Sequence, residues 1–204
     1  SGTLTHPVAD CTNFFVDNSA SVMLIGDSHL DAIGIQIQQR FKELGVGSYS
    51  VSYRSCVALK GFYQIGQNLQ HECHKYNQSM LQYARDLGIE TLILISRFPL
   101  YLDGARYDNG EGGVESGGPV AIDLIERFPA RSDWEDLARR ERVHRRYTSE
   151  LKELLNEFNV IVFEPTPEVG WDVVSRFVKL HNIGAVDKII THSYDSHIAR
   201  SSDF

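Results

Sequence analysis

The residues most able to do chemistry follow the first apolar run of the sequence. The run Ser21 to Ile25 suits a strand buried on both faces, and Gly26-Asp27-Ser28-His29 comes directly after it. A serine at a strand-to-helix turn presents its hydroxyl at the rim of the sheet. Its backbone N–H points from the helix N-terminus towards a developing anion, and Gly26 permits the tight turn. Ser28 is therefore a candidate nucleophile, with the alternative that it only caps the helix.

A nucleophilic serine needs a base within hydrogen-bond reach. The nearest late pairing of an acid with a histidine is Asp195 with His197. On a strand these two side chains would face the same side, whereas on a helix they would diverge. Asp27, directly ahead of the serine, is expected to stabilise the turn with its carboxylate rather than to carry a proton.

The chain has three cysteines, Cys11, Cys56 and Cys73. In an oxidising compartment Cys56 and Cys73 are the expected pair, because a crosslink over a loop of this length stabilises by about 3 kcal/mol. Cys11 is then left over, which is compatible with a partner cysteine outside this chain. The competing hypothesis is a metal site, since His71, Cys73 and His74 are potential ligands close together in sequence. That cluster lacks the separated pair-plus-pair spacing of structural zinc sites, so we predict no metal and no cofactor.

These residues need a scaffold, and the sequence alternates strand-like and helix-like segments. Apolar residues from Leu30 to Leu44 recur at spacings of three and four, which predicts a helix ending near Gly45. The segments that follow are a strand at Tyr49–Tyr53, a helix ending with Met80–Leu87, a strand at Glu90–Ile95, a glycine-rich loop at 104–118, a helix at Asp133–Glu157 and a strand at Asn159–Phe163. This order predicts an α/β fold with a parallel sheet and helices on both faces, in which ligands bind beyond the carboxyl ends of the strands. We expect residues 1–20 to be a lead-in and residues 21–204 to form one domain.

The composition, 42% hydrophobic and 23% charged, is typical of a folded soluble domain. No apolar stretch approaches the roughly 20 residues needed to span a bilayer. The formal net charge of -7 argues against nucleic-acid binding through a broad basic surface, because phosphate neutralisation supplies most of that affinity. One basic cluster, Arg139 to Arg146, is interleaved with acids and apolar residues, and we interpret it as one solvated helix face.

Several segments together carry a family resemblance. They are Gly26–His29 after the first strand, Ser55–Gly61, Cys73, Leu94–Tyr101, Tyr107–Glu115 and Pro165–Val173. The first resembles the opening signature block of the SGNH/GDSL hydrolase superfamily. The others are similar to the SGNH domains fused behind membrane acyltransferase-3 domains, and the resemblance covers most of the chain from about Cys11 onward. It implies a three-layer α/β/α, flavodoxin-like fold, and we expect its C-terminal portion to be missing here.

The resemblance implies roles for particular residues. Ser28 would be the acyl nucleophile and would contribute its own N–H to the oxyanion hole. Gly61 is the nearest match to the oxyanion-hole glycine of the second block. The asparagine of the third block is missing, because the strand ends in Ser96-Arg97-Phe98. Arg97 could supply donors instead, and Asn109 is a weaker candidate.

The fourth block of the superfamily, Asp-x-x-His, does not follow the last predicted strand. In that block histidine is the general base and aspartate orients it. The segment Thr191–Asp195 resembles the stretch that precedes this dyad in the fused branch. We therefore expect the chain to stop before its catalytic Asp and His, with Asp195 and His197 as the fallback pair.

The leading hypothesis is transfer of an acyl group, expected to be acetyl, to a bacterial cell-surface polysaccharide through a seryl-acyl intermediate. The implied partners are a membrane acyltransferase-3 domain in the same or a separate chain, an acyl donor, and a polysaccharide or oligosaccharide acceptor. The domain would act in the periplasm, tethered to the inner membrane. With water as acceptor the same site would be a carbohydrate esterase. A second hypothesis is a non-catalytic glycan-binding module, in which Tyr101, Tyr107, Trp134 and Trp171 could stack on sugars.

Overall fold

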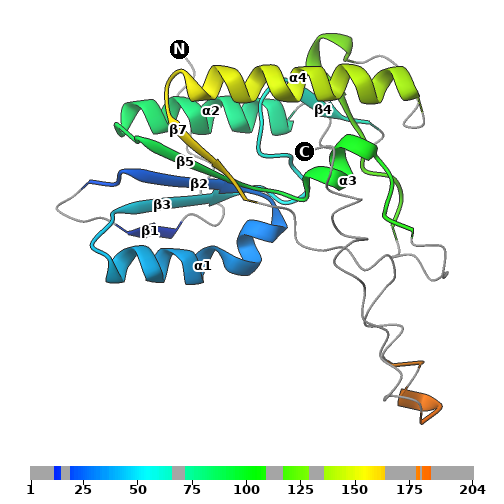
Figure 1. Ribbon diagram of the computed structural model, residues 1–204, viewed down its shortest axis with the longest axis horizontal. Helices are drawn as coiled ribbons and strands as arrows, with labels where there is room; N and C mark the ends of the chain where they lie inside the picture. Colours follow the sequence, from blue (N-terminus) through cyan, green and yellow to red (C-terminus); the bar gives the residue numbers. More distant parts are fainter. Residues whose placement is uncertain are drawn as a thin grey trace.

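The computed structural model describes residues 12–14, 19–65, 72–108, 117–128, 136–163, 178–179 and 181–184. Its centre is a five-stranded sheet with the strand order β1-β3-β2-β5-β7 (Figure 1). The strands are β1 (Thr12–Phe14), β2 (Val22–Gly26), β3 (Ser48–Ser52), β5 (Thr91–Ile95) and β7 (Asn159–Val162). Strands β3, β2, β5 and β7 are parallel, as the alternation of segments predicts, and β1 pairs antiparallel with β3.

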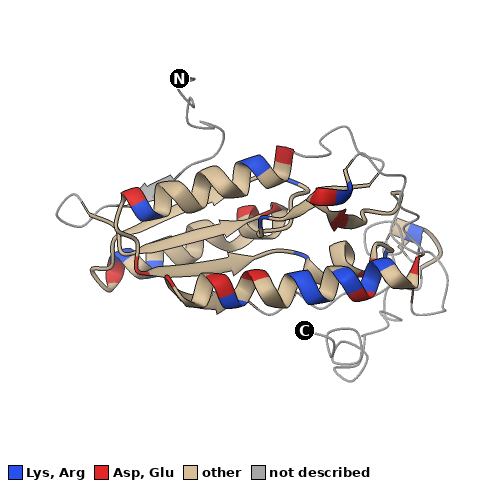
Figure 2. Cartoon of the chain, turned by 90° about the horizontal axis from the view of Figure 1, so that it is seen from above, with Lys and Arg blue, Asp and Glu red and all other residues tan. Residues whose placement is uncertain are grey.

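Helices cover both faces of the sheet. α1 (Ser28–Glu43) packs on one face, while α2 (Glu72–Asp86) and α4 (Leu137–Leu155) lie side by side over the other (Figures 1 and 2). Long crossover connections of this kind are needed because parallel neighbours cannot be joined by a tight turn. The predicted α/β arrangement in three layers is confirmed.

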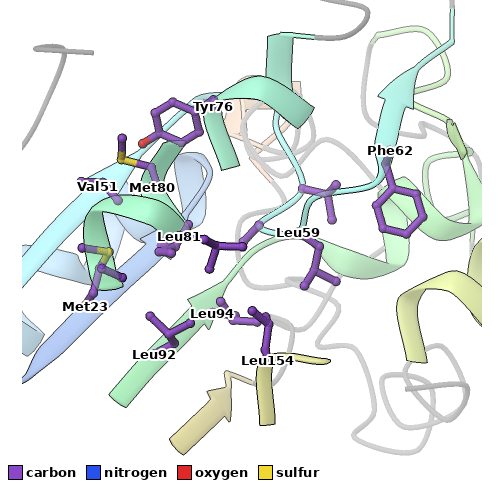
Figure 3. Packing of buried hydrophobic residues seen from close by; sticks show 14 of the residues in the cluster. Met23, Val51, Leu59, Phe62, Tyr76, Met80, Leu81, Leu92, Leu94 and Leu154 are labelled. Atoms are coloured by element: carbon purple, nitrogen blue, oxygen red, sulfur yellow. The ribbon is translucent and has the colours of Figure 1, made fainter. Parts of the chain in front are cut away.

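Side-chain alternation along the central strands divides the core into two layers. On β2, Met23 and Ile25 belong to the large cluster against α2 and α4, whereas Val22 and Leu24 belong to the smaller cluster against α1. Figure 3 shows part of the large cluster, in which Leu94 of β5 lies among side chains from the helices. Strands buried on both faces appear in the sequence as continuous apolar runs, which explains why these strands were predictable.

A small second sheet and a short helix lie beyond the carboxyl ends of the parallel strands (Figure 1). β4 (Phe62–Gln64) pairs antiparallel with β6 (Ile122–Leu124), and a 3-10 turn at Ile125–Arg127 follows β6. α3 (Phe98–Asp103) begins directly after β5. The sequence does not predict these elements, because segments this short show no measurable periodicity.

β1 lies in the segment that we predicted to be a lead-in. It pairs with β3, with Thr12 opposite Ser50 and Phe14 opposite Ser48, and so extends the sheet by one edge strand. The predicted boundary at residue 20 is therefore wrong, since part of the sheet precedes it. A three-residue strand at an edge leaves too little pattern in the sequence to be recognised.

The basic cluster on α4 is not one solvated face, contrary to the interpretation of its sequence. Arg139 is fully buried and donates to backbone carbonyls of α3 and β6 at 2.8 Å, 2.9 Å and 3.0 Å. Arg142, one turn further on, donates to both carboxylate oxygens of the buried Asp123, at 2.7 and 2.6 Å. Such bidentate pairs hold both partners in one geometry. Two arginines of the cluster therefore fasten α4 to α3 and β6.

The structure joins Cys56 and Cys73 in a disulfide, as the sequence predicts. Their Cα atoms are 5.4 Å apart, within the range of ordinary disulfides. Both residues are buried. The bond fastens the loop that follows β3 to the first turn of α2, which bears directly on the site described below.

Replacing both residues by alanine is expected to lower the free energy of unfolding by about 3 kcal/mol, because the crosslink restricts the unfolded chain. Urea unfolding of the oxidised wild type and of the double variant Cys56→Ala/Cys73→Ala measures the difference. Reduced wild-type protein should unfold at the midpoint of the double variant. Equal midpoints for oxidised and reduced wild type, or recovery of both thiols free from protein made under oxidising conditions, would count against the bond.

Candidate active site

Ser28 is the first residue of α1, and it is exposed although the turn before it is buried. The N-cap of the helix is Asp27, whose Oδ1 accepts the N–H of His29 at 2.8 Å. The alternative that Ser28 itself caps the helix is therefore wrong. Among the residues that the structure describes, none makes a hydrogen bond to the Ser28 hydroxyl, so this hydroxyl is open to a substrate.

Gly26 allows the backbone of the β2–α1 turn to approach β5 closely. A Cβ at this position would collide with the carbonyl oxygen of Ile95 and with Cβ of Leu30. The next residue, Asp27, donates its backbone N–H to the same Ile95 carbonyl at 3.2 Å. Only a glycine fits here, and this contact places the start of α1 against the end of β5.

Asp27 ties the turn to α3 through its second carboxylate oxygen. Oδ2 accepts the backbone N–H of Arg97 at 3.0 Å and the hydroxyl of Tyr101 at 2.8 Å. The carboxylate is 1% exposed and has three donors in all, so the expectation of a turn-stabilising aspartate is confirmed. Burial and the neighbouring Asp27 charge raise the pKa of the Tyr101 phenol, which therefore donates as a neutral hydroxyl. Tyr101 is itself buried, so it does not provide the sugar-stacking surface considered from the sequence.

The strands on either side of β2 bring two arginines to the same edge of the sheet as Ser28. Gly26 is level with Ser52 of β3 and with Ile95 of β5 in the parallel register. Arg54 and Arg97 follow these strands by two residues each, on opposite sides of the β2–α1 turn. The structure thus places Arg97 at the turn with its backbone N–H on Asp27, and a role of its guanidinium in an oxyanion hole stays a prediction.

Asp31, Ser52 and Arg54 form a cluster at this edge that the sequence does not predict. Ser52 donates its hydroxyl to Oδ1 of Asp31, and Arg54 donates its Nε to Oδ2 of the same carboxylate at 3.3 Å. The rule that ligands bind beyond the carboxyl ends of parallel strands could have singled out Ser52 and Arg54, because both stand at the end of a predicted strand.

The loop that follows β3 is held in place by side chains from α2 and β5. The amide of Asn77 donates to the carbonyls of Val57 and Leu59 at 2.8 and 2.9 Å. Ser96, at the end of β5, accepts the N–H of Ala58 on its hydroxyl oxygen at 3.1 Å. Together with the disulfide, these contacts hold the loop against α2 and the end of β5. Ser96 points into this loop, so it does not replace the missing asparagine of the third block.

Gly61, at the end of this loop, has its N–H engaged. It donates to Nδ1 of His74 at 2.9 Å, and a Cβ at Gly61 would crowd the side chains of Arg146 and Glu150 on α4. In this arrangement the Gly61 N–H is not available as an oxyanion donor, so the structure does not support that predicted role. The sequence does not show this hydrogen bond, because its acceptor, His74, lies on α2 and meets Gly61 only in the folded chain.

The same bond bears on the metal hypothesis. Nδ1 of His74 is occupied by the Gly61 N–H, and Cys73 is in the disulfide and so offers no thiolate. In the described residues no group of three or more His, Cys, Asp or Glu side chains is arranged to hold a metal ion. His74 therefore serves to position the loop.

Comparison with protein families identifies the chain. Residues 5–203 match the family described as the SGNH domain (fused to AT3 domains). The chain belongs to this family. Searches of curated proteins and of solved structures give no significant match.

Membership in the SGNH domain family places the chain among hydrolases and acyltransferases, in agreement with the resemblance and the three-layer fold. The description of the family names AT3 domains, the membrane acyltransferase-3 domains, as its fusion partners. Among the helices in the described ranges, none has the length and apolar character needed to cross a membrane.

Some residues singled out from the sequence of this SGNH domain lie outside the described residues. They are Cys11, His71, Asn109, Trp134, Trp171, Asp195 and His197. A general base for Ser28 is therefore not assigned, and the pairing of Asp195 with His197 stays a prediction.

Proposed function

We propose that this SGNH domain transfers an acyl group, in the first instance acetyl, to a hydroxyl of a bacterial cell-surface polysaccharide. Ser28 is the acyl nucleophile. The reaction takes place on the periplasmic side of the inner membrane, where a membrane acyltransferase-3 domain in the same or a separate chain delivers the acyl group. The family description supports the choice of partner.

The observation that carries the proposal is that Ser28, at the β2–α1 turn, has an exposed hydroxyl that does not cap the helix. Asp27 performs the capping that a serine at a helix start usually performs, and this leaves the Ser28 hydroxyl exposed. The first N–H groups of a helix have no partner within the helix. The N–H of His29 goes to Asp27, whereas the N–H of Ser28 has no acceptor among the described residues. One residue thus offers both a nucleophile and a donor for an oxyanion.

The reaction proceeds in two steps, in which Ser28 first loses and then regains its proton. Its oxygen forms a bond to the acyl carbon while the donor's leaving group departs with the serine proton. The acceptor hydroxyl then attacks the acyl carbon, the bond to the serine oxygen breaks, and the proton of the acceptor returns to Ser28. The exposure of Ser28 also favours a second candidate function, esterase activity, because water reaches the same acyl-enzyme.

Trapping the acyl-enzyme tests this proposal. Protein mixed with p-nitrophenyl acetate and quenched in acid is expected to carry one acetyl group on the peptide that contains Ser28. Ser149 is an exposed serine in the middle of α4 and serves as the internal control for non-specific acetylation. Adding an acceptor oligosaccharide before the quench should shorten the lifetime of the adduct for a transferase but not for an esterase. Acetyl groups spread equally over Ser28 and Ser149 would refute the seryl intermediate.

A further inference from the structure

Arg54 pairs with Asp31, a residue of α1 that lies about one helical turn from the proposed nucleophile. Its Nε donates to Oδ2 of Asp31, and Asp31 follows Ser28 by three residues on α1, which places both on the same side of the helix. Three residues span about 4.5 Å along a helix axis. The pair of Arg54 and Asp31 therefore lies at the same end of α1 as Ser28.

The carboxylate of Asp31 holds this arginine in a defined orientation. One oxygen accepts from Nε of Arg54 and the other from the hydroxyl of Ser52, so Asp31 is itself fixed to the end of β3. The next residue, Ser55, has φ of 62° and is the one non-glycine in the described residues with a left-handed backbone. Such strained residues occur at functional sites. Arg54 thus has one side-chain partner on α1 and precedes a residue with a constrained backbone.

The end of the guanidinium is left for a ligand. Among the described residues only Asp31 pairs with Arg54, and it does so through Nε, while the side chain of Arg54 is 78% exposed. The two terminal nitrogens of a guanidinium form a planar fork that matches a carboxylate or a phosphate. Arg54 pairs with Asp31 through Nε and leaves its two terminal nitrogens exposed, so these nitrogens can bind an anion at this end of α1.

We propose that Arg54 binds a negatively charged group of the acceptor glycan, a uronic acid carboxylate or a sugar phosphate, next to the hydroxyl that receives the acyl group. The Asp31 carboxylate offsets part of the charge of Arg54 through Nε, so the anion would be recognised by the terminal nitrogens of the guanidinium. The proposal rests on the proposed function and deepens it, because it makes the acceptor an acidic glycan.

Binding measurements without turnover test the role of Arg54. In the full chain carrying Ser28→Ala, we titrate three probes by calorimetry: a glucuronic acid tetrasaccharide, a phosphorylated maltotetraose and neutral maltotetraose. At least one anionic probe is expected to bind more tightly than the neutral one. Arg54→Gln should weaken its binding by about fivefold to tenfold and leave the neutral probe unchanged. Arg54→Lys keeps the charge but not the planar pair of nitrogens, so its affinity for the anionic probe should lie between that of Arg54 and that of Arg54→Gln.

Arg40 provides the matched control, because it is an exposed arginine on the same helix at the far end from Ser28, paired with Glu43 at 2.6 Å. Arg40→Gln changes the net charge equally and should leave all three affinities unchanged. Equal binding of neutral and anionic probes, absence of anion binding at millimolar concentration, or equal losses in Arg40→Gln and Arg54→Gln would overturn the proposal. Since no chemistry is involved, these results are independent of whether Ser28 forms an acyl-enzyme.

Discussion

Replacing Ser28 with alanine is expected to lower acyl transfer at least about a thousandfold while leaving the fold unchanged. The loss is large because the reaction has no other nucleophile at the β2–α1 turn. The stability cost is small because Ser28 is exposed and Asp27, not Ser28, caps α1. A surface substitution of this kind changes the free energy of unfolding by no more than about 0.5 kcal/mol.

Two measurements separate these effects. Initial rates of acetyl transfer, measured with the proposed membrane acyltransferase partner, give the loss of activity, and urea unfolding gives the change in stability. Ser149→Ala on the outer surface of α4 removes an exposed serine far from the turn, and it should keep the wild-type rate. If Ser28→Ala also kept a rate close to wild type, Ser28 would not be the nucleophile and the site would have to be sought elsewhere.

The main features of the fold were predictable because they depend on local patterns. The buried parallel strands β2 and β5 are continuous apolar runs, and α1 shows the spacing of a helix that covers one face of a sheet. The turn at Gly26 follows from the same patterns, since a glycine between a buried strand and a helix indicates close packing. These patterns made Ser28 a candidate either for a nucleophile or for a helix cap, and the resemblance of Gly26–His29 to the first SGNH block favoured the nucleophile.

Contacts between distant segments were not predictable. A sequence of alternating charges does not distinguish a solvated helix face from Arg139 and Arg142, whose partners are carbonyls of α3 and β6 and the carboxylate of Asp123. The bond from the Gly61 N–H to His74 has the same character, because each partner alone looks like a residue free for catalysis or metal binding. Sequence spacing predicts which residues share a face, but it does not predict which of their polar groups are already paired.

Replacing Asp27 with alanine is expected to have the largest effect on stability among the residues of the site. The carboxylate is buried and accepts from the N–H of His29, the N–H of Arg97 and the hydroxyl of Tyr101. Two of these donors would be left without a partner away from the helix end, and the helix would also lose its cap. Each of these three losses costs about 1 to 2 kcal/mol, so we expect the free energy of unfolding to fall by about 3 to 6 kcal/mol.

The activity of Asp27→Ala should fall by about a hundredfold as well, because α1 and α3 would no longer fix the positions of Ser28 and Arg97, and displacements of about 1 Å suffice for such a loss. Asp136→Ala is the matched control. Asp136 caps α4 through the N–H of Ala138 at 2.9 Å and also accepts from Arg142, but it is partly exposed, so its loss should cost less stability than the loss of Asp27 and no activity. Tyr101→Phe removes only one donor from Asp27. Its loss of stability and its loss of activity should lie between those of Asp27→Ala and Asp136→Ala. If Asp27→Ala destabilised no more than Asp136→Ala, the carboxylate would be an ordinary helix cap, and the link from Ser28 to α3 would have to rest on the Gly26 contact alone.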